Sequence, residues 1–207
     1  MSSSRAGTLL IVAAPSGAGK TSLVRAMVDS DPLVTVSVSH TTRPPRPAEV
    51  DGRDYHFVDA ERFEQLVQEG AFLEHAWVFG NRYGTTRAAV DEKLRDGLDV
   101  ILEIDWQGAR QARRHFAGAA SIFILPPSRA DLCNRLSARG QDSADVIDRR
   151  MAEAKSECSH WSEFDFLVVN GQFADALADL LAVVRSLRLR KSCQQHRLAA
   201  LFDDLLG

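Results

Sequence analysis

Residues 8–21 read TLLIVAAPSGAGKT, and this stretch decides the fold class. Residues 8–14 form a continuous apolar run, which is typical of a strand buried on both faces of a parallel sheet. Residues 14–21 match the phosphate-loop pattern G-x-x-x-x-G-K-[ST], with alanine in place of the first glycine. A helical pattern follows over residues 20–28. A strand, a glycine-rich turn and a helix in this order predict a loop that binds phosphate groups.

The residue types of this loop suit a chain of phosphates. Gly17 and Gly19 let backbone N–H groups face a phosphate, and the helix N-terminus adds the positive end of its dipole. Lys20 is expected to bridge the β- and γ-phosphates of a nucleotide, and Thr21 to ligate Mg²⁺. The expected ATP contacts in this loop are Ser16, Gly17, Ala18, Gly19, Lys20, Thr21 and Ser22.

Short apolar strands alternate with helical patterns along the rest of the chain. Strands are expected at residues 34–39, 99–105, 121–125 and 165–170, and helices at 86–95, 107–116, 128–139, 146–161 and 173–189. The alternation predicts an α/β fold, a P-loop core with a mainly parallel five-stranded sheet. Residues 40–85 interrupt it as an inserted α+β lobe, with strands at 55–58 and 72–79 and a helix at 60–69. The polar residues 139–150 are a candidate for a mobile helical lid.

A proline-rich segment at the start of the inserted lobe carries two arginines. Residues 43–47 read RPPRP and favour an extended, polyproline-like path with three residues per turn. That period places Arg43 and Arg46 on one side, about 9 Å apart at ~3.1 Å per residue. The two guanidinium groups could converge on one dianion, such as a nucleotide monophosphate. A solvated loop stiffened by proline explains the segment equally well.

Two further groups of charged residues carry possible chemistry. Glu103 and Asp105 are two apart at the carboxyl end of an apolar strand, where ligands bind in open α/β sheets, so a metal or water contact is expected. Asp105 could also cap the next helix, and the two roles are compatible. Arg135, Arg139 and Arg150 flank or lie within the expected lid and could stabilise charge on a transferring phosphate. Taken alone, solvated helix-face arginines are the favoured explanation of this second group.

Composition sets the broad class of protein. The 207 residues are 45% hydrophobic and carry a net charge of −3, which excludes a disordered chain, a collagen-like chain and a disulfide scaffold. The balanced charge predicts no nucleic-acid surface, and the short apolar runs and polar start predict no membrane span, no signal peptide and a cytoplasmic location. Of the 25 basic residues 21 are arginine. Either codon usage or the recognition of phosphate groups would explain this excess.

The ordered motifs together resemble those of bacterial guanylate kinases, a family of nucleoside monophosphate kinases. The matching segments are APSGAGKTS, SVSHTTRPPRPAEVDGRDYHFV, FLEHAWVFGNRYGT, ILEIDWQGA, SIFILPPS, RLSARGQD and FLVVN, and they span about residues 8–190. The resemblance implies three parts. A P-loop core would comprise residues 1–39, 88–128 and 158–207, a GMP-binding lobe residues 40–87, and a lid residues 129–157.

The resemblance also implies roles for individual residues. The GMP phosphate would contact Ser39, Arg43, Arg46, Tyr55 and Tyr83; guanine would contact Glu74 and Thr85; Glu103 and Asp105 would lie close to GMP. Asp105, through water, and Thr21 would hold Mg²⁺, Arg135 and Asn170 would contact ATP, and Lys20, Arg139 and Arg150 would be catalytic. This chain has Glu103 where many relatives have Asp, and Thr85 where Ser is common, which keeps the hydroxyl.

The implied reaction is Mg²⁺-dependent transfer of the ATP γ-phosphoryl group to GMP or dGMP, for guanine nucleotide synthesis and recycling. A ribose bisphosphate kinase of phosphonate breakdown would share the P-loop but would not need Glu74, Thr85 or the Tyr83 segment. An inactive guanylate-kinase-like interaction module would usually have a degraded P-loop, whereas Gly17, Gly19, Lys20 and Thr21 are intact here. The oligomeric state stays open, a homo-oligomer included.

Overall fold

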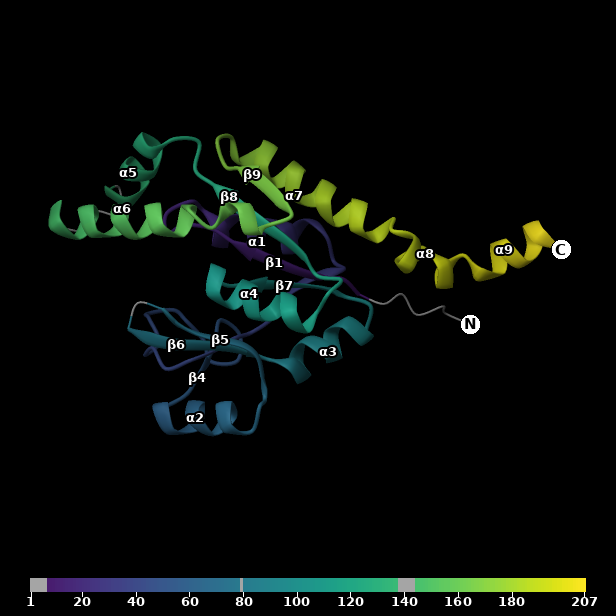
Figure 1. Cartoon of the computed structure of the whole chain (residues 1–207), viewed down its shortest axis with the longest axis horizontal. Coiled ribbons are helices and arrows are strands. Elements are labelled where there is room, and N and C mark those ends of the chain that lie inside the picture. Colours follow the sequence, from purple (N-terminus) through teal and green to yellow (C-terminus); the bar gives the residue numbers. More distant parts are fainter. Residues whose placement is uncertain (1–6, 79, 138–143) are drawn as a thin grey trace.

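A five-stranded parallel sheet forms the centre of the molecule in the computed structural model, which describes residues 7–78, 80–137 and 144–207 (Figure 1). The strands lie in the order β2-β7-β1-β8-β9. Their bounds are β1 Leu9–Ala13, β2 Val34–Val36, β7 Asp99–Glu103, β8 Ala120–Leu125 and β9 Phe166–Val169. All five residues of β1 are buried, as its unbroken apolar sequence predicts for the central strand of a parallel sheet.

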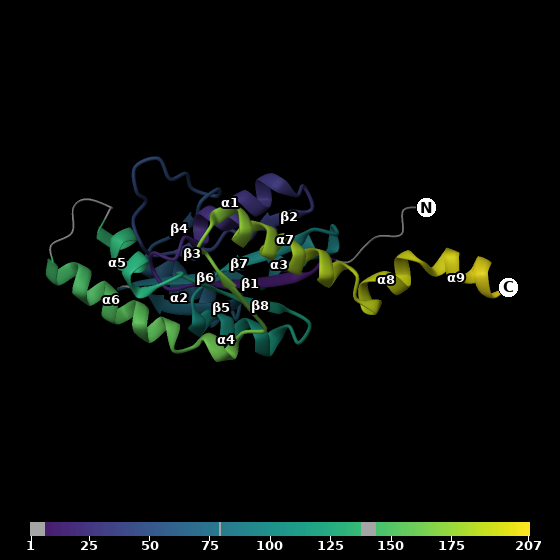
Figure 2. The ribbon, with the colours of Figure 1, turned by 90° about the horizontal axis from the view of Figure 1, so that it is seen from above.

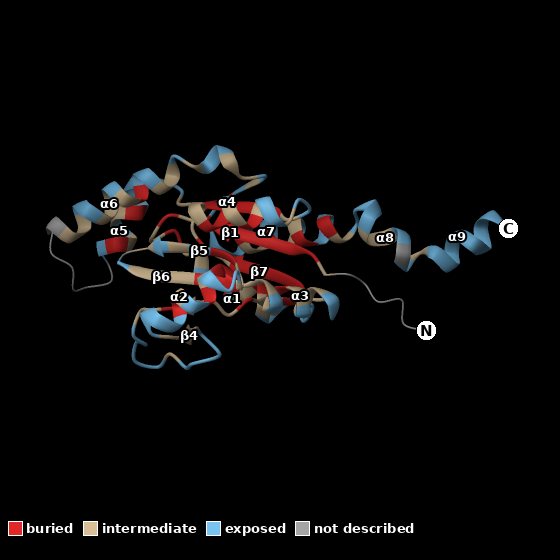
Figure 3. Ribbon diagram, turned by 60° about the horizontal axis from the view of Figure 1, so that its bottom comes forward, coloured by how far each residue is buried: buried red, intermediate tan, exposed pale blue. Residues whose placement is uncertain are grey.

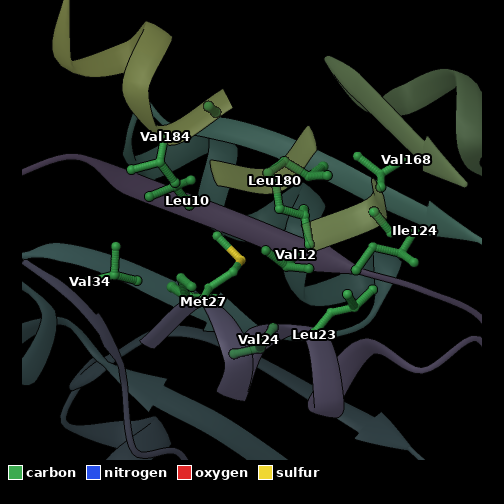
Figure 4. Packing of buried hydrophobic residues seen from close by; sticks show 14 of the residues in the cluster. Leu10, Val12, Leu23, Val24, Met27, Val34, Ile124, Val168, Leu180 and Val184 are labelled. Atoms are coloured by element: carbon green, nitrogen blue, oxygen red, sulfur yellow. The ribbon is translucent and has the colours of Figure 1, made fainter. Parts of the chain in front are cut away.

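Helices cover both faces of this sheet because successive strand residues point to opposite sides. On one face, Leu10 and Val12 pack against α1 (Lys20–Ser30) and α7 (Phe173–Arg188), with Met27 and Leu180 between the elements (Figure 4). On the other face, Leu9 and Ile11 pack with residues of α3 (Arg87–Arg95) and α4 (Trp106–His115). Figure 3 shows the resulting buried band along β1 and β7.

A second sheet lies beside the first and has the order β4-β3-β6-β5. Its strands are β3 His40–Thr41, β4 His56–Phe57, β5 Phe72–Val78 and β6 Asn81–Thr86, and α2 (Ala60–Gln68) connects β4 to β5. The capping carboxylate of Asp59 accepts a hydrogen bond from the Arg62 N–H at 2.7 Å, which fixes the start of α2. Helix α4 contacts both β1 and β5, so it joins the two sheets.

The remaining helices lie at the two ends of the molecule (Figure 2). Helices α5 (Arg129–Ser137) and α6 (Ala144–Cys158) pack together at one end, and the short 3₁₀ helix η1 (Trp161–Glu163) returns the chain to β9. The Ser128 hydroxyl caps the start of α5, because Ser128 Oγ accepts a hydrogen bond from the Asp131 N–H at 3.0 Å. Helices α8 (Lys191–Arg197) and α9 (Ala199–Leu206) extend away from the core at the other end. No helix in the described ranges is both long and apolar enough to span a bilayer.

The structure confirms the predicted α/β class and five-stranded parallel sheet, and it differs in local details. The strand expected at 99–105 ends at Glu103, and the short strand β3 was not predicted. The strand expected at 34–39 ends at Val36, although the Ser37 N–H still donates to the Ile101 carbonyl at 3.0 Å. Strand β6 was not predicted separately, because its sequence NRYGTT has no apolar alternation and is held by pairing with β5. The helices after residue 189 were also not predicted.

A buried ion network joins α7 to the amino-terminal ends of the central strands. The Asp99 carboxylate is fully buried, and its two oxygens accept from the Thr8 N–H at 2.8 Å and from Arg188 Nε at 2.6 Å. Arg188 Nη1 also donates to Asp31 Oδ2 at 2.6 Å. One guanidinium thus compensates two carboxylates, one of which has no exposure to water.

Replacing Arg188 with alanine is expected to lower the free energy of unfolding by about 3 kcal/mol, because it removes the cation beside a buried carboxylate. The loss falls at the lower end for such pairs, since the Thr8 N–H still satisfies one oxygen of Asp99. Urea denaturation measures the change. Arg185→Ala, an exposed position on the same helix, is the control and should change the value by less than about 0.5 kcal/mol. Equal effects of the two substitutions would refute a special role for the network.

Candidate functional site

A cavity of about 300 Å³ lies at the carboxyl ends of β1 and β7, between the phosphate loop and the second sheet. Open α/β sheets bind ligands at this edge, outside the carboxyl ends of their strands. Most of the sequence-predicted site residues line it together: Ser16, Gly17, Gly19, Lys20, Thr21, Ser22, Ser39, Tyr55, Glu74, Tyr83, Glu103 and Asp105. Two parts of the chain that are distant in sequence therefore form one site.

The phosphate loop has the backbone geometry that its glycines predict. Gly17 and Gly19 have φ angles of +90° and +91°, a region that residues with a side chain rarely adopt. A Cβ on Gly19 would also lie 2.5 Å from Asn170 Nδ2, so glycine is needed there for space as well. Lys20 opens α1, and its ammonium donates to the Ile104 carbonyl at 3.1 Å. The lysine charge is thus held at the carboxyl end of β7, inside the cavity.

Arg135 and Asn170 lie behind this loop and do not line the cavity. Asn170 is buried, and its Nδ2 donates to the Ala18 carbonyl at 2.8 Å. Arg135 Nη2 donates in turn to the Asn170 carbonyl at 2.8 Å. Both residues therefore support the loop backbone in this structure, and their predicted contact with ATP stays a prediction.

Two carboxylates stand opposite the loop. Glu103, at the end of β7, accepts a hydrogen bond from the Thr21 hydroxyl. Asp105 caps α4, with Oδ1 accepting from the Gly108 N–H at 2.9 Å, and it lines the cavity as well. The capping role considered for Asp105 is therefore observed, and its contact with a metal or water stays a prediction. The side chain of Glu103 is one methylene longer than that of aspartate, and its carboxylate reaches the Thr21 hydroxyl directly.

The most unusual group of the site is Glu74 on β5, whose side chain is buried. Burial raises the pKa of this carboxyl to about 7, against the opposing effect of its hydrogen bonds with Thr85. Glu74 and Thr85 are cross-strand partners, and the Thr85 hydroxyl lies 2.9 Å from that of Ser39. Within the described residues Glu74 Oε1 has no hydrogen-bond partner, although it is buried. A carboxylate oxygen in that situation is available to a ligand donor in the cavity.

Space for the Glu74 carboxylate is provided by Gly108 on α4. A Cβ at this position would lie 2.6 Å from Glu74 Oε2 and 3.3 Å from the Ile104 side chain. The glycine is buried within a helix, where alanine would otherwise be preferred. Its sequence context gives no sign of this role, because the contact joins two elements that are 34 residues apart.

Gly108→Ala is expected to displace the Glu74 carboxylate. Binding of a ligand that contacts Glu74 should then weaken by about tenfold or more. Binding of the phosphate-loop ligand should change by less than about twofold, because that loop does not contact Gly108. Separate Michaelis constants for ATP and GMP, the two substrates that the sequence resemblance implies, measure the two effects. Gly118→Ala, where a Cβ meets open space, is the matched control. A variant with both constants unchanged would contradict the close packing of Gly108 on Glu74.

Two tyrosines form the wall of the cavity on the second-sheet side. The rings of Tyr55 and Tyr83 lie edge to face with their centroids 5.9 Å apart. Burial raises the pKa of the Tyr55 hydroxyl above its ordinary value, so this group is a neutral hydrogen-bond donor. The Arg43 guanidinium lies over the Tyr55 ring at 5.4 Å. These aromatic rings therefore link the cavity to the proline-rich segment.

Arg43 and Arg46 do not line the cavity, and both contact the carboxylate of Glu49, Arg43 through its side chain and Arg46 through its backbone. Arg43 Nη2 donates to both Glu49 oxygens, at 2.8 and 3.0 Å, and this hydrogen bonding raises the pKa of Arg43. The Arg46 backbone N–H donates to Glu49 Oε2 at 2.7 Å, while the Arg46 side chain is exposed. Only one of the two guanidinium groups, that of Arg43, thus holds an anion in this structure, and that anion is a residue of the chain. Convergence of both guanidinium groups on one dianion stays a prediction.

The lid is described only in part. Arg150 on α6 lies near the loop, with Nη2 3.4 Å from Ser16 Oγ. Residues 138–143 of the expected lid, Arg139 among them, lie outside the described residues. Sequence reasoning missed Glu157, which lines the cavity from α6. The seven-residue spacing from Arg150 could have indicated it, since residues seven apart share a helix face.

Comparisons with known proteins agree with this geometry. The guanylate kinase family model matches residues 6–187. A guanylate kinase of Alkalilimnicola ehrlichii is 61% identical over 97% of this chain and 99% of its own length, and that of Escherichia coli K12 is 54% identical over 97% and 98%. The crystal structure of guanylate kinase from Anaplasma phagocytophilum superposes with a TM-score of 0.76 at 30% identity, covering 91% of this chain and 90% of its own. With the phosphate loop and the buried Glu74 facing one cavity, the chain belongs to the guanylate kinase family.

Proposed function

We infer that this chain is a guanylate kinase, which transfers the γ-phosphoryl group of ATP to GMP and gives ADP and GDP. The observation that carries this beyond the family name is the buried Glu74, whose free oxygen shares a cavity with a phosphate loop. The inferred reaction needs both features. A phosphate loop alone fits any nucleoside triphosphate, whereas the buried carboxylate selects the acceptor.

Glu74 and Thr85 would recognise guanine. One carboxylate can accept hydrogen bonds from both N1–H and the 2-amino group of guanine, while adenine has no such pair of donors. A site with a buried polar group rejects a base that leaves the group unpaired, because desolvation is then uncompensated. Burial of Glu74 makes this penalty large. The GMP phosphate would be bound by Ser39, Arg43, Arg46, Tyr55 and Tyr83, with the phosphate replacing Glu49 as the anion held by Arg43.

ATP would bind on the other side of the cavity. The N–H groups of residues 16–22 and the Lys20 ammonium would hold its phosphates, and Arg135 and Asn170 would support this loop and lie near the nucleotide. The GMP phosphate is already nucleophilic as a dianion, so the reaction needs no general base. Positioning of the two substrates and compensation of charge would supply the rate enhancement. Lys20, Arg139 and Arg150 are the cations proposed for that compensation.

A magnesium ion fits the oxygen groups of this site. Thr21 offers a hydroxyl, Asp105 a carboxylate reached through water, and Glu103 lies beside them on the same cavity. Hard oxygen ligands suit Mg²⁺, which commonly keeps several waters and binds through substrate phosphates. When bound, the ion would neutralise charge on the ATP phosphates.

The three parts proposed for the chain match these tasks. The core, residues 1–39, 88–128 and 158–207, would bind ATP; residues 40–87 would bind GMP; and residues 129–157 would close over the phosphates and exclude water. We further propose dGMP as an acceptor and a cytoplasmic site of action.

An ADP-release assay with ATP, Mg²⁺ and a panel of monophosphates tests the proposed function. GMP and dGMP should support turnover, and AMP, CMP and UMP should support little, because only the guanine nucleotides satisfy Glu74. Equal turnover with AMP would refute the role of the buried carboxylate. An absence of GMP-dependent turnover would refute the function itself.

A further inference from the structure

Helix α6 contacts the phosphate loop through two side chains that meet the same residue. Glu157 Oε2 accepts a hydrogen bond from the Ser16 backbone N–H at 2.9 Å. Arg150, two turns earlier on α6, places Nη2 3.4 Å from the Ser16 hydroxyl. The carboxylate contact is the shorter of the two, and it is made to the backbone of the loop.

The contact with Glu157 fixes one peptide group of the loop at both ends. The Pro15–Ser16 peptide presents its carbonyl to the Ala18 N–H at 3.1 Å and its N–H to Glu157. Gly17 follows directly with a φ of +90°, and its lack of a side chain leaves the loop free to adopt other conformations. A peptide group held on both sides limits that freedom, so the N–H groups that follow keep one direction.

The surroundings of Glu157 suit a fixed acceptor. Its side chain is half-buried and lines the cavity with Lys20 and Asp105. Burial raises its pKa, and the Ser16 N–H and the Lys20 charge oppose that rise. Such a carboxylate loses hydrogen bonds to water, and the Ser16 backbone N–H at 2.9 Å replaces one of them.

We propose that Glu157 is a positioning residue for ATP, because it locks the Pro15–Ser16 peptide and holds the phosphate loop ready for binding. The proposal rests on the inferred function only in taking ATP as the ligand of this loop. By the same contact, α6 of the proposed lid is joined to the loop. A carboxylate that instead occupied the place of a phosphate would oppose ATP binding, and the experiment separates these two effects.

The test measures ATP affinity by calorimetry and both Michaelis constants in Glu157→Ala and Glu157→Gln. The alanine variant should bind ATP about tenfold more weakly, because a charge-assisted hydrogen bond to the loop is lost. The glutamine variant keeps an oxygen acceptor and should recover affinity to within about threefold of the parent chain. The Michaelis constant for GMP should change by less than about twofold in both. Glu153→Ala, one turn earlier and part of a 3.9 Å pair with Arg149, is the control and should leave ATP affinity unchanged.

Three results would overturn the proposal. Tighter ATP binding in both variants would identify Glu157 as a competitor of the phosphate. Unchanged ATP affinity in the alanine variant would remove any role in positioning. Equal weakening of ATP and GMP binding would indicate a general structural effect, and thermal melting of each variant identifies that case. Since calorimetry reports ATP binding without turnover, failure of this proposal is distinguishable from an absence of GMP-dependent activity.

Discussion

Replacing Lys20 with methionine is expected to lower kcat by about 10²–10³-fold, the loss typical of removing one preorganised group that stabilises transition-state charge. Lys20 begins α1 directly after Gly19, and its ammonium is held at the end of β7 by the Ile104 carbonyl. Methionine keeps the length of the side chain but removes the charge. The Michaelis constant for GMP should change little, because the second sheet that carries Glu74 is untouched.

Steady-state kinetics with ATP, GMP and Mg²⁺ measure this effect, and circular dichroism checks that the variant is folded. Lys191→Met, at an exposed position of α8, removes one lysine charge far from the cavity and serves as the control. The control should keep the parent kcat. A Lys20→Met variant with near-parent kcat would exclude the role proposed for the loop lysine.

Replacing Glu74 with glutamine is expected to lower kcat/KM for GMP by about 10³-fold, since the amide group presents a donor to a guanine donor and leaves it unpaired. The Michaelis constant for ATP should stay within about twofold of the parent value. Glu69→Gln is the matched control in the same part of the chain, because Glu69 is exposed and pairs with Arg62 at 3.5 Å on the surface. A glutamine variant with unchanged selectivity among monophosphates would refute recognition of guanine by Glu74.

The pH dependence of GMP use gives an independent test of the same residue. The pKa of Glu74 is raised to about 7 by burial, so the carboxyl is increasingly protonated as the pH falls through that value. The protonated acid cannot accept two hydrogen bonds from guanine, so kcat/KM for GMP should fall by about tenfold per pH unit below the pKa. Glu74→Gln should lose the part of this dependence near pH 7 and keep only the part near about pH 6, where the GMP phosphate itself takes up a proton. A parent profile that is flat from pH 5 to pH 8 would contradict the account, with ~pH 5–8 chosen to bracket the raised pKa.

Sequence patterns within a single element predicted those strands, turns and helices whose structure depends mainly on their own residues. The apolar run of β1 and the glycines after it identified the phosphate loop, because a buried parallel strand and a left-handed backbone each leave a clear mark on the sequence. Strand β6 leaves no such mark. Its sequence is polar, and its strand geometry comes from pairing with β5 and β3.

The residues of the candidate site divide in the same way, into those that local sequence spacing predicts and those that depend on the tertiary fold. The spacing of Glu103 and Asp105 predicted that both would reach one cavity, and they do. No spacing predicts the burial of Glu74, which depends on a cross-strand partner and on a helix that approaches from elsewhere; only the family resemblance pointed to this residue. The contact of Glu157 with Ser16 joins positions 141 apart and is likewise a product of the tertiary fold.

The central claim is that one cavity holds a phosphate donor and a guanine-reading acceptor site. Phosphorus NMR of the purified chain with ATP, Mg²⁺ and GMP tests it most directly, because all substrates and products are observed together. The account predicts one GDP formed for each ADP, with no loss of ATP when GMP is omitted. ADP and inorganic phosphate without GDP, or no change in the ATP signals when GMP is present, would contradict it.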